Sequence, residues 1–556
     1  MKCSLLDNHI AITDCFAHKD RLKNEFGARW NEKNKVWLLG ATLENARKLR
    51  DAFNPVFDDI ILGVFRQKRD RDKLVKEIKN GSYSARFDFS KLISVPLMEH
   101  QTKGANIAME IFDSNGSGVM FSMEMGTGKT MTAMATIGKL AEDKGIKRVL
   151  VVCPKVAMQV WEQEYEKFAN YDYCLRVISG TPKRRLQRMN ELAEFDGLQI
   201  AVINYEYCYT FSKVLTKWCP DTIVCDESHK IKSPTSNQTK AIVGLGNNAR
   251  YKICLTGTPL TNNILDFFSQ YKFLDNTIFG DSFTNYKNKY VITGMFNEYL
   301  RPNPRTFEDL KEKVDSIAYR VTKEECLTLP PFVDIPVYVE LDNKTMSSYK
   351  QFETEFVTWL NSQTYISADN ALTQTLRLRQ LTGGFIYTKM EDGNTIVQQV
   401  DNAKLEACKE LIEEIVEQGN KVVVFAEFQS EIKAIKEMCD KLGVKSGTYY
   451  GATNEKDRKA LVDGFQNGDI QVFIGQIESA GISITLTSAK YMIFFSTGYK
   501  YGVYDQARAR IHRKGQTNKC TYYHLTVKHT IDEKILRSLQ KKEALAESII
   551  DDYRSK

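Results

Sequence analysis

The stretch that decides the fold is VMFSMEMGTGKTMTAMAT, residues 119–136. Its first residues, Val119-Met120-Phe121, form a short apolar run that predicts a buried strand, and the Ala- and Met-rich residues after position 130 have a helical pattern. Between them, MGTGKT (125–130) has the layout that turns backbone N–H groups and a helix N-terminus toward a phosphate chain. The stretch therefore predicts a phosphate-binding loop between a strand and a helix.

Each residue type in this loop suits a nucleoside triphosphate. Gly126, Thr127 and Gly128 bring backbone donors close to the anion, because glycine has no side chain in the way. Lys129 can reach the outer phosphates, and the Thr130 hydroxyl can hold Mg²⁺. A full phosphate-loop pattern has a further glycine at position 123, where this chain has a methionine. The prediction of ATP and Mg²⁺ as cofactors therefore also depends on the motifs that follow.

A pair of carboxylates, Asp226-Glu227, comes directly after the apolar run Thr222–Cys225. Strands alternate with helical patterns through this region, which predicts a parallel α/β sheet, and such sheets bind ligands at the carboxyl ends of their strands. Asp226 can hold Mg²⁺ through water, and Glu227 can deprotonate the water that attacks the γ-phosphate. An acidic helix cap would explain the pair in isolation, but not downstream of a phosphate loop.

Composition limits the class of protein. A chain of 556 residues with 42% hydrophobic residues predicts several packed domains, and a net charge of +7 permits an anionic partner without requiring one. The 12 cysteines are scattered, without a CxxC pair, so we expect no zinc site and no disulfide framework. No run approaches the roughly 18 apolar residues of a membrane span. These features predict an intracellular, soluble protein in a reducing compartment, with no membrane partner.

The order and spacing of further motifs resemble those of superfamily-two motors. GTGKT (126–130), DESH (226–229) and LTGTP (255–259) resemble the first RecA-like lobe of these proteins, and LTGTPLTNN (255–263) is similar to the Swi/Snf branch. A second α/β series begins at Lys421 and ends in DQARARIHRKGQ (505–516), which repeats the Swi/Snf pattern QAxxRxHRxGQ. The chain thus resembles a two-lobed Swi/Snf-family ATPase.

This resemblance implies roles for individual residues. Gln101 resembles the glutamine that reads adenine, and Arg510 and Arg513, on one helix face, resemble the arginine fingers that reach the γ-phosphate across the interlobe cleft. The other implied contacts are to the nucleotide at Gln506, and to nucleic acid at Pro154, Lys155, Thr256, Gly257, Ser479 and Gly481. The segment SAGISITLTSA (479–489) departs from the family pattern, with Ile482 and Thr485 in place of a Gly and an Asn.

The N-terminal segment predicts a small separate unit. Its helix and strand patterns end at Pro55, and FGARWNEKNKVW (26–37) resembles the N-terminal modules of annealing-helicase (HARP-type) proteins and similar phage domains. Trp30 and Trp37 can stack on bases while neighbouring Arg29, Lys33 and Lys35 hold phosphates. The alternative is that both tryptophans fill the core of this unit.

Together these patterns predict an α/β chain with two RecA-like parallel-sheet lobes, a helical insertion between them and a small α+β N-terminal domain. The expected ranges are 1–58 for the accessory module, 59–91 for a charged linker, 92–320 for lobe 1, 321–400 for the insertion and 401–556 for lobe 2 with a C-terminal helix.

The resemblance implies ATP-dependent translocation on double-stranded DNA, with strand annealing, fork regression or branch migration as the outcome. It favours a phage or bacterial source. A strand-separating helicase and an ATP-gated clamp without productive movement remain as alternatives.

Overall fold

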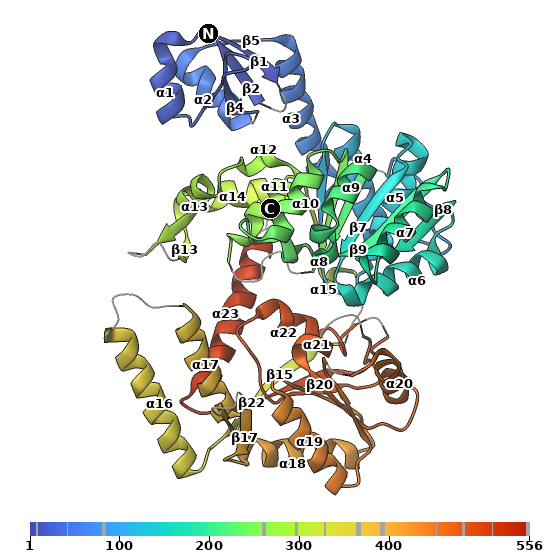
Figure 1. Ribbon diagram of the computed structural model, residues 1–556, viewed down its shortest axis with the longest axis vertical. Coiled ribbons are helices and arrows are strands. Elements are labelled where there is room, and N and C mark those ends of the chain that lie inside the picture. The colour runs from blue at the N-terminus through green and yellow to red at the C-terminus, as the bar shows by residue number, and fades with distance from the viewer. Residues whose placement is uncertain are drawn as a thin grey trace. The chain divides into compact units, whose positions relative to one another are not determined.

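The computed structural model describes residues 1–6, 9–41, 43–79, 85–257, 263–294, 299–326, 330–362, 368–389, 395–451, 453–480, 484–513 and 515–551 (Figure 1). The chain divides into two compact units, Met1–Thr322 and Lys323–Lys556, and each is described by itself.

The first unit begins with a small α+β module. Its five-stranded sheet has the order β3-β4-β2-β1-β5. Its elements are β1 (Lys2–Leu6), β2 (His9–Thr13), α1 (Lys19–Asn24), β3 (Arg29–Asn31), β4 (Val36–Gly40), α2 (Leu43–Phe53) and β5 (Val56–Phe57). Ile10, Ile12, Leu22 and Leu49 are fully buried in its core.

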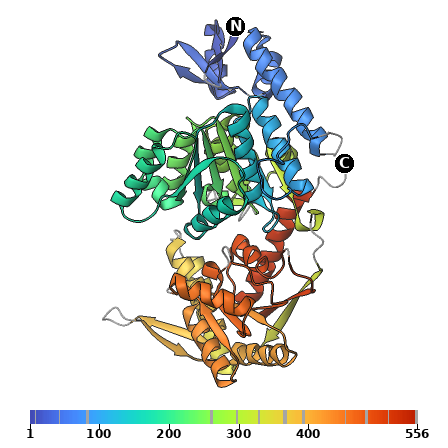
Figure 2. The same ribbon diagram turned by 90° about the vertical axis from the view of Figure 1, so that its right-hand side faces the viewer.

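The charged segment after the module contains a 21-residue helix, α3 (Asp59–Lys79). Ile61 and Phe65, at its start, are buried in the core of the module. At its end, Lys79 Nζ lies 2.6 Å from Asp315 Oδ1 of lobe 1. The helix therefore runs from the module to helix α4 of lobe 1, as two views of the structure show (Figure 1, Figure 2).

Lobe 1 is built on a seven-stranded sheet of order β14-β6-β11-β10-β7-β9-β8, in which all pairs are parallel. Its strands are β6 (Gly118–Met123), β7 (Arg148–Cys153), β8 (Tyr173–Val177), β9 (Leu198–Asn204), β10 (Thr222–Asp226), β11 (Tyr251–Thr256) and β14 (Ala318–Val321). The central strands are buried along nearly their whole length, as is typical of parallel sheets.

Helices connect these strands. They are α4 (Glu99–Asp113), α5 (Lys129–Lys144), α6 (Met158–Phe168), α7 (Pro182–Ala193), α8 (Tyr205–Thr210), α9 (Ser212–Trp218), α10 (Asn237–Gly246), α11 (Asp266–Leu274), α12 (Asn276–Phe279), α13 (Phe283–Tyr290) and α14 (Phe307–Asp315). A separate antiparallel pair, β12 (Val291–Thr293) and β13 (Tyr299–Pro302), follows α13.

The second unit has a six-stranded parallel sheet of order β15-β22-β21-β18-β20-β19. Its strands are β15 (Phe332–Val339), β18 (Val422–Ala426), β19 (Ser446–Tyr449), β20 (Val472–Gln476), β21 (Tyr491–Phe494) and β22 (Cys520–Val527). The antiparallel pair β16 (Phe385–Lys389) and β17 (Thr395–Gln399) lies outside this sheet. The helices of the second unit are α15 (Lys323–Cys326), α16 (Asn343–Ser362), α17 (Ala368–Thr382), α18 (Ala403–Glu417), α19 (Gln429–Lys441), α20 (Glu455–Gln466), α21 (Ile477–Ala480), α22 (Tyr501–Arg508) and α23 (Ile531–Asp551).

The predicted α/β fold with parallel-sheet lobes is confirmed, and α16 and α17 are long helices of the expected insertion. Within the range for which an insertion was expected, however, Phe332–Val339 forms an edge strand of the second sheet. It pairs over its whole length with β22, nearly 200 residues further along the chain, and such long-range pairing leaves little local signal. The individual domain ranges remain predictions.

A buried carboxylate lies in the core of the second unit. Glu431, at the start of α19, accepts hydrogen bonds from the backbone N–H of Phe428 at 3.1 Å and from the Ser496 hydroxyl. Burial raises the pKa of Glu431 to about 7. Lys404 and Arg379 act in the opposite direction, because their positive charges stabilise the ionised form.

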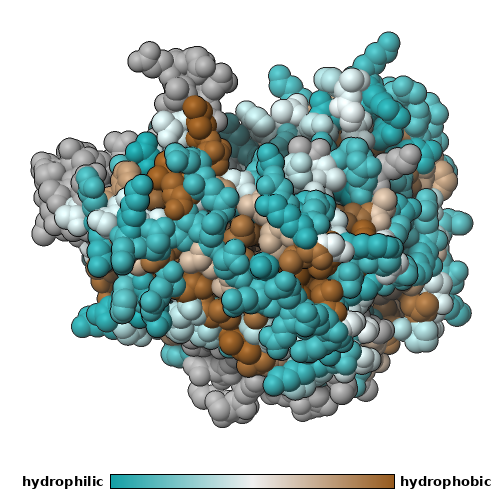
Figure 3. All heavy atoms as spheres, turned by 90° about the horizontal axis from the view of Figure 1, so that it is seen from below, coloured by the Kyte–Doolittle hydropathy of each residue, from teal (hydrophilic) through white to brown (hydrophobic). Residues whose placement is uncertain are grey.

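Within the described ranges, no helix has the length and apolar character needed to cross a membrane. Seen from below, the surface is mostly hydrophilic, and its hydrophobic side chains lie in separate patches (Figure 3).

Candidate functional site

The motifs of lobe 1 meet at one edge of its sheet. Strand β11 lies between β6 and β10, with Thr256 opposite Ser122 of β6 and Leu255 opposite Asp226 of β10. Because all three strands are parallel, their carboxyl ends lie together. The phosphate loop, the carboxylate pair and the Thr-Gly segment, far apart in sequence, are therefore neighbours.

The phosphate loop has the backbone that its glycines predict. Gly126 and Gly128 have φ angles of 90° and 87°, a region that residues with a Cβ rarely adopt. A Cβ at Gly128 would also lie 2.0 Å from Gln101 Nε2. Helix α5 begins at Lys129, whose Nζ donates to the carbonyl of Met123 at 3.0 Å. The lysine ammonium is thus held over the loop, where a phosphate chain would be bound.

Gln101 contacts this loop directly. Its side chain is buried, Oε1 accepts from Met98 N at 2.9 Å and Nε2 donates to the Thr127 carbonyl at 3.3 Å. The same carbonyl lies 2.8 Å from Nε2 of His100, a residue for which the sequence predicted no role. The residue implied to read the base and the loop implied to hold the phosphates are therefore joined at Thr127.

Asp226 lies at the end of β10 with both carboxylate oxygens engaged. Oδ2 accepts from Trp161 Nε1 at 2.9 Å, and Oδ1 accepts from the backbone N–H of Glu227, also at 2.9 Å. Burial, reinforced by the neighbouring charge of Glu227, raises the pKa of Asp226 to about 6. The nearby Lys129 ammonium opposes this shift because it stabilises the charged form.

Glu227 has an unusual backbone conformation. Its φ of 53° lies in the left-handed region, which costs a non-glycine residue of order 1–3 kcal/mol and persists only where surrounding structure imposes it. Its Oε2 lies 3.4 Å from His229 Nδ1. Strained backbone of this kind gathers at functional sites, and here it turns the carboxylate that follows Asp226 at the end of the strand.

The donors at this edge fit a magnesium ion that is shared with phosphates. Thr130 offers a hydroxyl and Asp226 a carboxylate, whereas among the described residues no cluster of three or more His, Cys, Asp or Glu side chains could hold a metal. Mg²⁺ is commonly held by one or two protein oxygens together with substrate phosphates and water. Thr130 and Asp226 would supply the protein oxygens.

The residues of lobe 1 implied to contact nucleic acid lie near the same edge. Pro154 and Lys155 follow β7 directly, and Lys155 is exposed at the start of a short 3₁₀ helix. Thr256 is fully buried at the end of β11, and a Cβ at Gly257 would lie 3.3 Å from the Met125 side chain of the phosphate loop. The Thr-Gly segment thus packs on the loop, while positions 258–262 of the same motif lie outside the described residues.

In the second unit, α22 ends at Arg508, so Arg510 and Arg513 lie in the turns after it and the expectation of one shared helix face was wrong. The two arginines have different surroundings. Arg510 is buried, and its guanidinium donates to the carbonyls of Gln506 at 2.9 Å and Ile484 at 3.1 Å. Arg513 is half-buried and donates to the Thr485 hydroxyl at 2.9 Å. Arg510 is therefore fixed by backbone carbonyls, whereas Arg513 lies nearer the surface.

The other implied residues of this unit are distributed between two helices. Gln506 is buried on α22, and the Ser479 hydroxyl on α21 donates to Gln476 Oε1 at 3.1 Å. Gly481 lies outside the described residues.

Sequence reasoning missed three contacts that shape the site. Trp161 donates to the carboxylate of Asp226, and the Tyr205 hydroxyl donates to its backbone carbonyl at 2.6 Å. Both residues lie on helices that follow other strands. His229, in contrast, is part of the DESH segment and stands two residues from Glu227, so its position was a usable signal.

Family models match most of the chain. Residues 73–383 match the SNF2-related domain, and residues 403–515 match the helicase conserved C-terminal domain. The chain belongs to the SNF2-related family. The predicted class, a Swi/Snf-type ATPase of the helicase superfamily, is confirmed.

Individual relatives agree with this assignment. The chain is 25% identical over 484 residues to an uncharacterized ATP-dependent helicase of Mycoplasma pneumoniae, covering 86% of this chain and 44% of that protein. It is 27% identical over 484 residues to the DNA repair and recombination protein RDH54 of Saccharomyces cerevisiae, covering 79% of this chain and 50% of the relative. The chain thus spans about half the length of the curated relatives it matches.

Among solved structures, the chain matches the Sulfolobus solfataricus SWI2/SNF2 ATPase core in complex with dsDNA. The identity is 25% and the TM-score is 0.41, with 84% of this chain and 96% of that chain covered.

Proposed function

We propose that this protein hydrolyses ATP in a DNA-dependent reaction and uses it to move along double-stranded DNA, remodelling branched substrates. The observation that carries the proposal is the meeting of the phosphate loop with Asp226 and Glu227 at one edge of the lobe 1 sheet. A loop that cradles phosphates beside a carboxylate pair is the equipment for γ-phosphate hydrolysis. The name of the yeast relative, a DNA repair and recombination protein, supports DNA as the partner.

In the proposed reaction each residue has a definite task. Lys129 moves from its backbone acceptors to the outer phosphates, and Glu227 orients the attacking water and takes its proton. Thr130 and Asp226 would hold Mg²⁺, which would supply positive charge to neutralise the phosphates. Arg513 supplies positive charge to the γ-phosphate in the transition state, and Arg510 holds the segment that carries it.

Nucleotide recognition is proposed for Gln101 and Gln506, in addition to the loop residues Gly126, Thr127 and Gly128. Contacts to the nucleic-acid backbone are proposed for Pro154, Lys155, Thr256, Gly257, Ser479 and Gly481. Contacts to phosphates carry no sequence information, which suits a motor that moves along any sequence. A preference for forked or branched DNA, with annealing or fork regression as the outcome, belongs to the same proposal.

The test is ATP hydrolysis by the purified protein, measured in parallel with no nucleic acid, single-stranded DNA, linear duplex, forked duplex and RNA. We expect duplex and forked DNA to stimulate hydrolysis most. Greatest stimulation by single strands or RNA would instead favour a strand-separating helicase. Hydrolysis that no nucleic acid stimulates would favour the ATP-gated clamp and contradict the proposal.

One observation favours the strand-separating helicase as a second candidate. Such enzymes need a wedge, and β12 and β13 of lobe 1 form an antiparallel pair that carries exposed Leu300 and Arg301. A strand-displacement assay on a forked duplex tests this role. Under the helicase hypothesis, Leu300→Asp would abolish displacement while leaving ATP hydrolysis intact, whereas the translocase proposal expects little displacement from the unmodified protein.

A further inference from the structure

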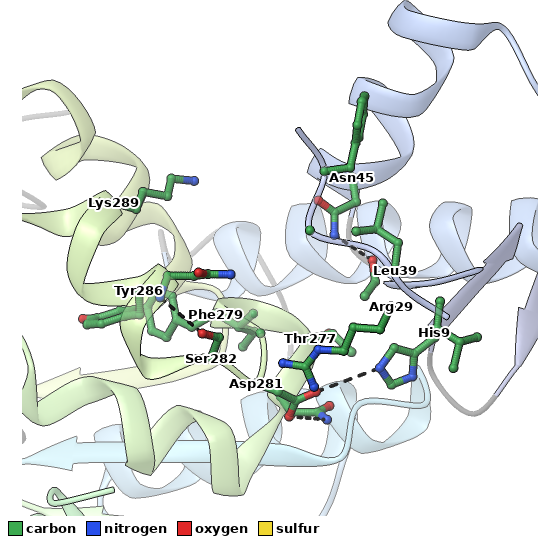
Figure 4. Close-up of a pocket in the computed structure, with 18 of the residues that line it drawn as sticks. His9, Arg29, Leu39, Asn45, Thr277, Phe279, Asp281, Ser282, Tyr286 and Lys289 are labelled. Atoms are coloured by element: carbon green, nitrogen blue, oxygen red, sulfur yellow. Dashed lines mark hydrogen bonds and ion pairs between the residues drawn. The ribbon is translucent and has the colours of Figure 1, made fainter. Parts of the chain in front are cut away.

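A groove with a volume of 530 Å³ lies within the first unit, between the N-terminal module and lobe 1 (Figure 4). Strands β2, β3 and β4 and helix α2 provide the wall on the module side. Helices α12 and α13 and the residues between them provide the opposite wall. The groove is thus formed by two parts of the chain that are more than 200 residues apart in sequence.

The module presents one face of its sheet to this groove. Register places Arg29 opposite Leu38 and His9 opposite Gly40, and residues paired across antiparallel strands share a face. Trp30 is paired with Trp37, with ring centroids 5.6 Å apart, and by alternation both lie on the other face. The tryptophans and the Arg29 cation, which the sequence grouped together, therefore belong to different surfaces.

The groove has an excess of positive charge. Four cationic side chains line it: Arg29, Lys48, Lys289 and Lys313. The lining carboxylate Asp281 already has His9 at 3.9 Å and Lys272 at 3.6 Å. A carboxylate behind the lining, Asp309, forms ion pairs with Lys289 at 3.0 Å and with Lys313 at 3.5 Å. Four lysine and arginine side chains thus line the groove together with one carboxylate, Asp281, which favours an anionic ligand.

Arg29 is exposed to such a ligand. Its guanidinium extends from β3 into the groove toward the lobe 1 wall, as Figure 4 shows. Its side chain is exposed, and among the described residues no carboxylate lies within ion-pair distance of it. The half-buried aromatic side chains of Phe26 and Phe279 line the same groove, one from each wall.

We propose that this groove binds a single strand of nucleic acid, with its phosphates on the cations and its bases against the aromatic side chains. A positive groove with aromatic residues is the usual equipment for single-strand binding. Its volume falls in the range of about 300–1,000 Å³ typical of ligand pockets, which suits a short single-stranded segment rather than a duplex. The inference deepens the proposed function and rests on it, because a branched substrate supplies such a strand.

The consequence is a link between the accessory module and the motor lobe. A strand in this groove contacts both walls at once, so its binding fixes the module relative to lobe 1 without a new protein contact. The module would then distinguish branched DNA from plain duplex by the presence of an unpaired strand.

The test measures binding of fluorescein-labelled oligothymidylate and of a labelled hairpin duplex to the full chain without nucleotide. The double variant Arg29→Ala/Lys48→Ala removes two groove cations, and Lys33→Ala/Arg47→Ala removes two exposed cations of the same module that do not line the groove. We expect the groove variant to weaken oligothymidylate binding several-fold. Its slope of log K against log salt should fall by about 1.4, because each lost phosphate contact removes about 0.7. The control variant should keep the slope of the unmodified protein.

The opposite wall offers an isosteric pair. Asn285→Asp on α13 adds a carboxylate to the groove, whereas Asn288→Asp adds one to the same helix outside it. Only the first should weaken oligothymidylate binding, and melting temperatures of all variants should match, because these side chains are exposed. A loss confined to the module variants would contradict a two-walled groove.

Other outcomes would overturn the inference. Equal losses in groove and control variants would indicate non-specific attraction, and an equal loss of duplex binding would identify a duplex site. Displacement of oligothymidylate by polyglutamate at matched charge would indicate a general acidic ligand. Failure of the unmodified protein to bind oligothymidylate would refute the groove while leaving duplex-stimulated ATP hydrolysis, and hence the proposed function, intact.

Discussion

Replacing each arginine of the second-unit motif by alanine should separate a structural arginine from a catalytic one. Arg510 is 3% exposed and donates to the carbonyls of Gln506 and Ile484. A hydrogen bond from a charged group contributes about 1.5–3 kcal/mol, so losing two should destabilise the second unit by about 3–6 kcal/mol. For a unit of this size, that lowers the melting temperature by at least about 6 °C.

Arg513→Ala should behave in the opposite way. Its guanidinium donates to the Thr485 hydroxyl from a half-buried position, so its loss should cost only about 1 kcal/mol of stability. An arginine that stabilises charge on a transferring phosphate contributes about 10³–10⁵ to kcat. The variant should therefore fold normally, keep its affinity for ATP within a modest factor and lose at least about 10³ in turnover.

Scanning calorimetry and DNA-stimulated hydrolysis at saturating ATP measure the two effects separately. Arg537→Ala, an exposed arginine of α23, is the control and should change neither quantity. The reasoning is refuted if Arg513→Ala hydrolyses ATP within about tenfold of the unmodified protein, well short of the expected effect. It is equally refuted if Arg510→Ala melts normally.

Three further predictions concern the phosphate loop, the carboxylate pair and the core of the second unit. Lys129→Ala and Glu227→Gln should both abolish ATP hydrolysis in single-turnover assays, and Glu227→Gln should still bind a fluorescent ATP analogue. Normal hydrolysis by either variant would contradict the proposed mechanism. Gly128→Ala should lower ATP affinity because the new Cβ would lie 2.0 Å from Gln101 Nε2. Gln101→Ala should also lower it, but the double variant should lose less than the sum of the two, because the clash disappears with the amide; strictly additive losses would show that the clash is unimportant. Glu431→Gln should be more stable than the unmodified protein at about pH 8, because the native pKa of about 7 exceeds the ordinary 4.5 and the buried charge destabilises the fold above it. That advantage should shrink by up to about 3 kcal/mol as the pH falls to around 5 and Glu431 takes up a proton, and a pH-independent difference in hydrogen-exchange protection would contradict this account.

Much of the fold was readable because its signals are local. A few neighbouring residues are enough to predict three of its elements. These are the strand before the phosphate loop, the strand that ends at Asp226 and the helix at the C-terminal end. Strand β15 gave no such signal, because five of its eight residues are exposed and its partner strand is distant in sequence. The charged segment gave no sign that Ile61 and Phe65 are buried in the module core, and deleting residues 1–58 would expose both side chains.

The candidate site was predictable where the spacing of motifs carried the information. The loop, the carboxylate pair and Gln101 were grouped from their order and spacing along the chain and from the family resemblance, and their roles remain predictions. The contacts of Trp161 and Tyr205 with Asp226 depend on strand order, which no single segment encodes. The difference between Arg510 and Arg513 was likewise invisible, because two arginines three positions apart look alike in a sequence until their acceptors are known.

The contacts that Gln101 and His100 make with the Thr127 carbonyl have a consequence for the choice of nucleotide. Gln101 Nε2 and His100 Nε2 both lie within hydrogen-bond distance of this one atom, and the same Gln101 amide lies against Gly128. A purine that draws the amide away must therefore also alter the loop that receives its phosphates. We expect GTP or inorganic triphosphate, which offer the amide no matching edge, to be rejected through a misshapen loop as much as through a missing hydrogen bond, so discrimination would appear in kcat as well as in KM.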